Sequence, residues 1–130
     1  MLRKRLGLEV IERGGLRARH YFKIPSSLII PESCKKIGSS AFVNCISLKE
    51  VVISEGVELI GRCAFEDCWW LKKVVIPGSV KIIEDNAFWG CEEATIMIMN
   101  KSSEKDFKYL GRKAFRYCKE VSYVKEEAWD

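Results

Sequence analysis

Six cysteines in a chain of 130 residues are the side chains best able to do chemistry, as metal ligands, disulfide partners or nucleophiles. Four of them end copies of one motif, in which Ala-Phe is followed three residues after the Phe by a cysteine: Cys45, Cys68, Cys91 and Cys118. The chain has no C-x-x-C pair, the spacing that structural zinc sites commonly use. The pattern therefore disfavours a metal finger.

A disulfide ladder is the second possible chemistry. If the four motifs stack, neighbouring cysteines lie about 4.7–4.9 Å apart, a distance that a disulfide could span. Side chains that all point the same way are poor geometry for a bridge, so we expect reduced, buried thiols that act as small apolar fillers, Cys34 included. When the four copies of the motif are aligned, the position of Cys63 is polar in the other copies, so we expect this cysteine alone to be exposed and reactive. That column of the alignment holds Ser40, Cys63, Asn86 and Lys113.

Other catalytic patterns are missing from the sequence. His20 is the only histidine, and we expect it to pack on the inner face of an N-terminal hairpin. No glycine-rich phosphate loop and no G-x-S-x-G motif occurs. Carboxylate pairs such as Glu66-Asp67 stand at variable positions, where a solvated surface is the default. We predict a non-enzymatic protein with no cofactor, no metal site and no small-molecule substrate.

The net charge of +4 is concentrated at the start of the chain. Residues 1–23 hold seven Lys or Arg against two Glu, whereas the remainder is close to neutral. Such a segment could contact nucleic acid or an anionic membrane, but solubility explains the charges as well and nucleic-acid binding is not favoured. No apolar run follows the basic start, so we predict no signal peptide and no membrane span. A cytoplasmic location follows for the chain as written, and a surface or secreted one if it belongs to a longer protein.

The elements that position these residues follow from a repeat. The first three Ala-Phe motifs are 23 residues apart and the fourth lies 27 further on, which is the signature of a solenoid. One turn reads I-P-x-S-V-x-x-I-G-x-x-A-F-x-x-C-x-x-L-x-x-V-x-I. The β-branched L-x-x-V-x-I stretch predicts a short strand, and the I-G-x-x-A-F-x-x-C stretch predicts a helical or irregular return. The predicted turns cover about 29–51, 52–74, 75–97 and 98–124, within a domain at 24–130 that ends in a short C-terminal tail.

Two departures from the regular turn are visible. The last turn carries four extra polar residues within Asn100–Asp106, for which we favour a harmless loop insertion over a binding element. Residues 1–23 show two runs of period-two alternation around Gly14-Gly15, which predicts a β-hairpin. We expect this basic hairpin to cap the stack by covering the edge of the first long strand.

The repeated sequence motif closely resembles the BspA-like, or treponemal-type, leucine-rich repeat, over about residues 24–125. The resemblance implies an α/β-type leucine-rich repeat solenoid, a short right-handed stack of about four 23-residue turns with a parallel sheet on one face. It also implies no enzymatic site in the repeat, and a cell-surface, adhesin-like role in binding other proteins or host matrix. The chain departs from the family in its missing export signal, its few repeats and its longer last turn.

Variable positions carry the candidate binding residues, because the scaffold does not require them. On the outward, concave side of the sheet we expect an apolar stripe from one column and charges from the next: Ile29, Val52, Val75 and Ile98, with Glu50 and Lys73 beside them. Trp69, Trp70 and Trp89 stand in columns that are mostly polar in other turns, and exposed tryptophans are enriched at interface hot spots. Packing along the rim is the alternative interpretation. The sequence thus predicts a protein-binding module or, alternatively, a structural or self-associating fragment of a longer surface protein.

Overall fold

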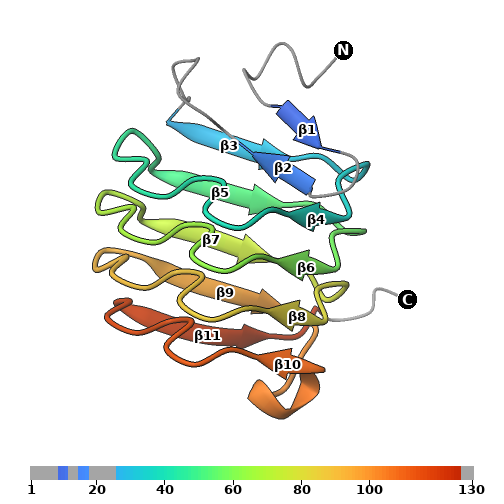
Figure 1. Ribbon diagram of the computed structural model, residues 1–130. Coiled ribbons are helices and arrows are strands. Elements are labelled where there is room, and N and C mark those ends of the chain that lie inside the picture. Colours follow the sequence, from blue (N-terminus) through green and yellow to red (C-terminus); the bar gives the residue numbers. More distant parts are fainter. Residues whose placement is uncertain (1–8, 12–14, 18–25, 127–130) are drawn as a thin grey trace.

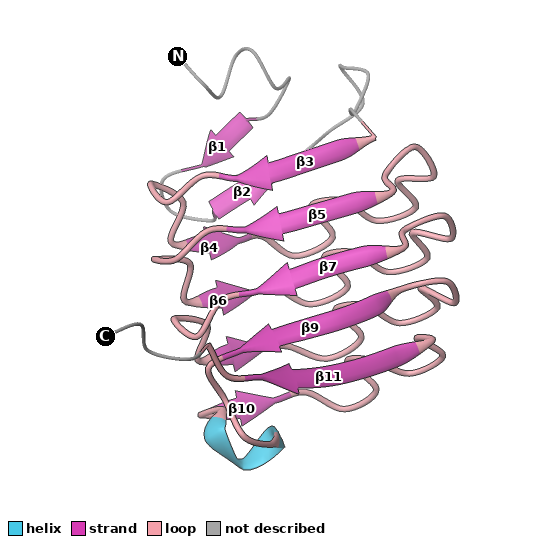
Figure 2. Cartoon of the chain, turned by 180° about the vertical axis from the view of Figure 1, so that it is seen from behind, coloured by secondary structure: helices cyan, strands magenta, loops and turns pink. Residues whose placement is uncertain are grey.

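The computed structural model describes residues 9–11, 15–17 and 26–126, which wind into a β-solenoid (Figure 1). Two sheets run along the stack on opposite sides of each turn (Figure 2). The five-stranded sheet has the order β11-β9-β7-β5-β3, and all of its pairs are parallel. Its strands are β3 (Ser27–Ile30), β5 (Glu50–Ile53), β7 (Lys73–Ile76), β9 (Thr95–Met99) and β11 (Glu120–Val124). The predicted repeat solenoid is confirmed.

The return side of each turn adds a second sheet that the sequence did not predict. It has the order β1-β2-β4-β6-β8-β10, and four of its strands are two residues long. These are β4 (Lys36–Ile37), β6 (Leu59–Ile60), β8 (Ile82–Ile83) and β10 (Tyr109–Leu110). After each of them the chain makes tight turns and not a helix, and among the described residues only Glu104–Asp106 form a 3₁₀ helix. The return is therefore irregular, with almost no helix.

The core fills the space between the two sheets. Within β5, Val51 and Ile53 are buried while Val52 between them is half-buried, as period-two alternation requires. The motif phenylalanines form a continuous stack, with ring centroids of Phe42, Phe65 and Phe88 5.0 Å apart. Because every turn leaves its apolar interior open to the next, only neighbouring turns can complete the burial.

The cysteine column has a specific bonding role. The thiol of Cys68 donates to the carbonyl oxygen of Phe42 at 3.1 Å, one turn earlier. Cys91 repeats this contact at 3.0 Å and Cys118 at 3.3 Å, each to the motif phenylalanine of the turn before. The column thus needs a residue as small and apolar as alanine or valine that can also donate a weak hydrogen bond, and cysteine meets both demands.

The N-terminal hairpin joins the second sheet. Strand β1 (Glu9–Ile11) pairs antiparallel with β2 (Gly15–Arg17), and Leu16 of β2 pairs with Ile37 of β4. The expectation that the hairpin covers the first long strand is therefore wrong, since β2 extends the row of two-residue strands instead. The predicted Gly14 turn position, His20 and the rest of the leader lie outside the described residues.

The strand register departs from the sequence alignment in the last two turns. Strand β9 pairs with β7 so that Thr95 lies opposite Lys73 and Ile98 opposite Ile76. The alignment had placed Ile96 opposite Lys73, because it did not allow for one residue fewer between Cys91 and β9 than between Cys68 and β7. A slip of one residue moves every side chain of a strand to the other face of the sheet.

The insertion in the last turn is held at its start by contacts of Asn100 and Lys101. With the corrected register it holds five extra residues, one more than expected. Lys101 is buried, donates from Nζ to the carbonyl oxygen of Gly78 at 3.0 Å and lies 5.0 Å from the centroid of the Phe107 ring. Asn100 adopts a left-handed φ of 60°, and its side-chain oxygen accepts from the backbone of Glu126. The insertion therefore links the third turn to the end of the described chain.

Candidate interaction surfaces

The rim of the solenoid is formed by the tight return loops, which share one backbone geometry. Each loop has two residues in the left-handed region, one directly before the Ala-Phe pair and one directly before the cysteine. The first column holds Ser40, Cys63, Asn86 and Lys113, and the second holds Asn44, Asp67, Gly90 and Tyr117. Asn, Asp and Gly tolerate this conformation best, whereas a tyrosine there is strained. Between these two bends the Ala-Phe pair points into the core, as in the second turn, where Ala64 and Phe65 are fully buried.

Two adjacent tryptophans are the most prominent apolar feature of this rim. Trp69 and Trp70 follow Cys68 and are 55% and 54% exposed. One turn earlier, Ile46 occupies the column of Trp69 and is 58% exposed. We call Ile46, Trp69 and Trp70 the aromatic rim. The placement agrees with the expectation that these tryptophans stand outside the core.

Trp89 lies apart from that pair and is covered on one side. It is half-buried, and its ring meets Tyr117 edge-on with centroids 5.5 Å apart and an interplanar angle of 83°. The guanidinium of Arg116 lies 5.2 Å from the Tyr117 centroid on the same turn. An edge-to-face pair of this kind is a packing interaction. The structure thus groups Trp89 with the last turn and not with the aromatic rim.

Carboxylates border the aromatic rim on the next turn. Glu92 and Glu93 follow Cys91 as Trp69 and Trp70 follow Cys68, and both are exposed. The equivalence is seen in the backbone, where Glu92 donates to Gly90 at 2.9 Å as Ile46 donates to Asn44. Glu66 and Asp67 lie on the same loop as the tryptophans. The aromatic rim therefore has acidic residues on two sides.

The outer face of the five-stranded sheet carries the predicted apolar stripe in part. Val52 and Val75 pair with each other across β5 and β7 and are half-buried, and Ile29 at the end of the row is 57% exposed. Glu50 and Lys73 pair in the neighbouring column, as expected. Ile98 was predicted to continue the stripe and this is wrong, since it is fully buried and Met97 takes its place opposite Val75.

The thiols are poorly suited to nucleophilic chemistry. Burial raises the pKa of Cys45 to about 11 and that of Cys118 to about 12, so neither forms a thiolate near neutral pH. Cys63 is half-buried and not exposed as predicted; burial first, and then its hydrogen bond with Glu66, raise its pKa. None of the ladder cysteines Cys45, Cys68, Cys91 and Cys118 is in a disulfide. Within the described residues no group of three or more His, Cys, Asp or Glu could hold a metal ion.

Sequence reasoning missed several exposed apolar residues. Ile46 was visible as an isoleucine in the column of Trp69, but one apolar residue carries little weight without knowledge of its exposure. Tyr117 is 55% exposed, and its signal was its place in a column of Asn, Asp and Gly. Tyr109, 47% exposed, gave no signal because the sequence did not predict the strand β10 on which it lies.

Comparison with known proteins adds the family to this geometry. Residues 20–127 match the BspA type leucine rich repeat region, with six copies of the repeat. The chain belongs to this family. No curated protein matches the sequence. Proteins built from such repeats are typically non-catalytic.

Two solved leucine-rich repeat proteins have a similar fold. One, from Bacteroides ovatus, is 25% identical with a TM-score of 0.63 over 91% of this chain. The other, from T. pallidum, is 21% identical with a TM-score of 0.68 over 92% of this chain. The BspA-type chain spans 35% of the first protein and 68% of the second. None of its described helices has the length and apolar character that crossing a membrane would require.

Proposed function

We propose that this leucine-rich repeat chain is a protein-binding module and that the aromatic rim is its principal contact surface. The exposure of Trp69 and Trp70, two adjacent rings that are each more than half accessible, carries the proposal. Tryptophan is the residue most enriched at the hot spots of protein interfaces, and an exposed pair has no role in closing the core. The family membership supports a binding role of this kind.

The surroundings of the aromatic rim indicate the chemistry of its partner. Glu92 and Glu93 continue the two tryptophan columns, and both carboxylates are exposed. An apolar or aromatic segment flanked by Lys or Arg would bury its apolar part on the rings and place its cations beside the glutamates. The stripe of Val52 and Val75 is a second candidate surface, but both residues are half-buried and offer less area.

The proposal is tested by paired variants in a capture experiment. Trp69→Ser with Trp70→Ser should abolish capture of any partner that the parent domain retains, because an aromatic hot spot contributes about 2 kcal/mol or more per residue. Val52→Lys with Val75→Lys is the matched double variant on the sheet face and should retain the partner. Circular dichroism establishes that both remain folded. Unchanged binding by the tryptophan variant would refute the aromatic rim, and loss only in the valine variant would move the site to the sheet.

A structural role is the alternative, in which the chain is part of a longer, self-associating surface protein. BspA-type proteins are often surface-associated, so an adhesin-like role belongs to the same proposal. Sedimentation equilibrium over a wide concentration range separates the two. A monomer that retains a different protein supports the binding module, whereas an oligomer that dissociates in the tryptophan variant supports self-association.

A further inference from the structure

The return loops around the aromatic rim change character from one turn to the next, and they lie one above another along one side of the stack (Figure 1). In the first turn Ile46 is 58% exposed, and the loop that holds it is uncharged. The second turn carries the exposed rings of Trp69 and Trp70. The third turn carries Glu92 and Glu93, which are both exposed. An apolar side is thus followed by an aromatic centre and an acidic side.

The two glutamates of the third turn are not neutralised by their own loop. In the first and second turns a lysine, Lys49 or Lys72, stands directly before the long strand. The third turn has one residue fewer between Cys91 and β9, and no lysine stands at this point. Glu92 and Glu93 have no ion-pair partner among the described residues. Their carboxylates are therefore available to a cation from outside the chain.

The stack also sets the distance between the apolar and the acidic groups. Neighbouring turns are about 5 Å apart, as the 5.0 Å between the ring centroids of the motif phenylalanines in the first three turns shows. An apolar side chain that contacts both Ile46 and Trp69 lies between the first and second turns, and so about 7–8 Å along the stack from the level of Glu92. An extended polypeptide advances about 6.5–7 Å over two residues, and residues i and i+2 point to the same side. The geometry therefore fits an apolar residue and a cation that are separated by one residue.

We propose that Glu92 and Glu93 make the aromatic rim selective for an extended segment of a partner protein in which an apolar residue and an Arg or Lys stand two positions apart. This selectivity rests on the proposed function, because the apolar residue is held by the aromatic rim. The cation lies beside the two carboxylates of the third turn. The uncharged loop of the first turn offers the cation no second site, so the order of the two side chains along the stack is fixed.

The charge of these loops disfavours other classes of partner. Residues 66–70 and 89–93 hold four acids and no Lys or Arg. The phosphates of nucleic acid and the surface of an anionic membrane would be repelled from this side of the stack. A segment with a carboxylate in place of the cation would be repelled for the same reason.

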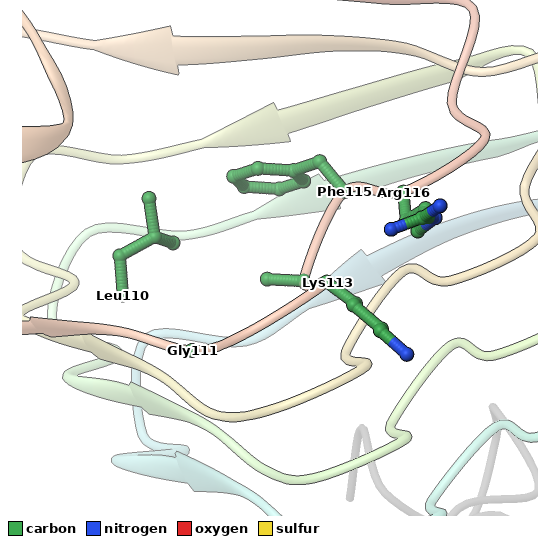
Figure 3. A pocket seen from close by; sticks show the side chains of 6 residues that line it. Leu110, Gly111, Lys113, Phe115 and Arg116 are labelled. Atoms are coloured by element: carbon green, nitrogen blue, oxygen red, sulfur yellow. The ribbon is translucent and has the colours of Figure 1, made fainter.

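A hollow beside the fourth turn belongs to the stacking of the repeat. Its volume is about 420 Å³, and the ring of Phe115 points toward Leu110 while the side chain of Lys113 extends away from both (Figure 3). In the earlier turns the same column of rings is covered by the following turn, as Phe65 is covered by Phe88. The hollow is therefore a face on which a turn of the repeat stacks.

The test uses the full chain and the peptide Gly-Ser-Leu-Ser-Arg-Ser-Gly, followed through the indole N–H signals of the chain in NMR spectra. Titration should shift the signals of Trp69 and Trp70, which the Trp69→Ser and Trp70→Ser variants assign. A peptide with glutamate in place of arginine should bind about three- to tenfold more weakly, since an exposed ion pair contributes little on its own. A peptide in which leucine and arginine are adjacent should also bind more weakly, because the two side chains then point to opposite sides.

An exchange of charge separates recognition from structural damage. Glu92→Lys with Glu93→Lys should reverse the preference, so that the glutamate peptide binds about three- to tenfold more tightly than the arginine peptide. Glu92→Gln with Glu93→Gln should remove most of the difference between the two peptides. Glu55→Lys with Glu58→Lys is the matched control, because it makes the same change of charge at exposed positions in the turn between β5 and β6. This control should keep the preference of the parent.

The outcomes distinguish the selectivity from the proposed function. If the Trp69→Ser, Trp70→Ser variant binds the arginine peptide as the parent does, the aromatic rim and its selectivity are both refuted. If that variant loses the peptide while the Glu92→Lys, Glu93→Lys variant keeps the preference of the parent, the aromatic rim stands and the selectivity is refuted.

Three further results would also overturn the assignment. Absence of any shift with the arginine peptide at millimolar concentration would remove the recognition of this pair of side chains. Tighter binding of a peptide with three residues between leucine and arginine, the spacing of one helix face, would replace the extended segment by a helix. Indole shifts that appear with rising protein concentration alone would identify a second copy of the chain as the occupant.

Discussion

The second and fourth turns share one sequence motif but differ in the turns that lie beside them. In the second turn Phe65 is fully buried, with parallel rings 5.0 Å away on both sides. In the fourth turn Phe115 is only partly buried, and the one ring that stacks on it within the described residues, that of Phe88, lies 5.7 Å away at an angle of 23°. The same residue type in the same column thus has a complete environment in one turn and half of one in the other.

This difference teaches that burial in a repeat protein belongs to interfaces between turns and not to the turns themselves. The cysteine column shows the same gradient. Cys68 and Cys91 in the interior turns are buried, whereas Cys45 and Cys118 in the outer turns are half-buried. A residue's contribution to stability should therefore depend on how many turns cover it.

The largest expected effect comes from removing a ring in the middle of the stack. Phe65→Ala should lower the free energy of unfolding by roughly 3–5 kcal/mol, because the cavity is enclosed by turns on both sides. Phe115→Ala should cost less, since solvent already reaches that ring and its surroundings can relax. Urea denaturation of the two variants measures the difference. Equal losses at both positions would contradict the dependence on neighbouring turns.

The glycine that precedes each Ala-Phe motif should not show this dependence on position in the stack, because the atoms it contacts lie in the preceding turn. A Cβ added at Gly61 would lie 2.7 Å from backbone atoms of Ile37, Gly38 and Ser39. At Gly111 an added Cβ would meet the backbone of Glu84 and Asp85, again one turn earlier. Gly61→Ala and Gly111→Ala should therefore both be destabilised, by about 1–3 kcal/mol, despite the terminal position of Gly111.

Thermal unfolding of the two alanine variants checks this prediction. A clearly milder effect at Gly111 would mean that the terminal turn shifts to accommodate the methyl group. In that case the backbone of the last turn can shift relative to the third turn, and its lower packing is not confined to its uncovered side.

How far the sequence predicts these features depends on insertions and deletions. The first three turns keep a constant spacing, so Phe42, Phe65 and Val52 stand where the pattern places them. Beyond Cys91 the loops before β9 and β11 are both shortened and the last turn carries an insertion, so the period is disturbed. Ile98 lies in the core and not on the predicted outer face, because a strand alternates with period two. The second sheet was missed because two-residue strands carry no alternation to detect.

The aromatic rim was predictable in outline, because Trp69 and Trp70 stand out in any alignment of the turns. The backbone bonding of the loops was not. The amides of Phe42, Phe65 and Phe88 each donate to the following turn, whereas no described residue accepts from the amide of Phe115. No residue type in a sequence indicates such a difference between backbone groups.

A smaller effect on stability should appear at alkaline pH. In the folded chain burial raises the pKa of Cys45 to about 11 and that of Cys118 to about 12, against an ordinary value of 9.0. The unfolded chain therefore loses these protons at lower pH than the folded chain does, and unfolding becomes easier as pH rises. The stabilising contribution should be complete below about pH 9 and decline between about pH 9 and 12. Cys45→Ala with Cys118→Ala should flatten that decline, and an unchanged slope would show that other groups cause it.

The order of thiol labelling is the most sensitive test of the contrast between interior and outer turns. Cys68 and Cys91 should resist alkylation until the chain unfolds, because both are buried and each donates a hydrogen bond to a buried carbonyl oxygen. Cys118 should react at an intermediate rate, since one side of its turn is uncovered. Cys63 should react first but more slowly than an unhindered thiol, because Glu66 and partial burial disfavour its thiolate. Mass spectrometry after timed exposure to iodoacetamide gives the order directly. Faster labelling of Cys91 than of Cys118 would show that the last turn is covered in solution, and the comparison between the second and fourth turns would then fail.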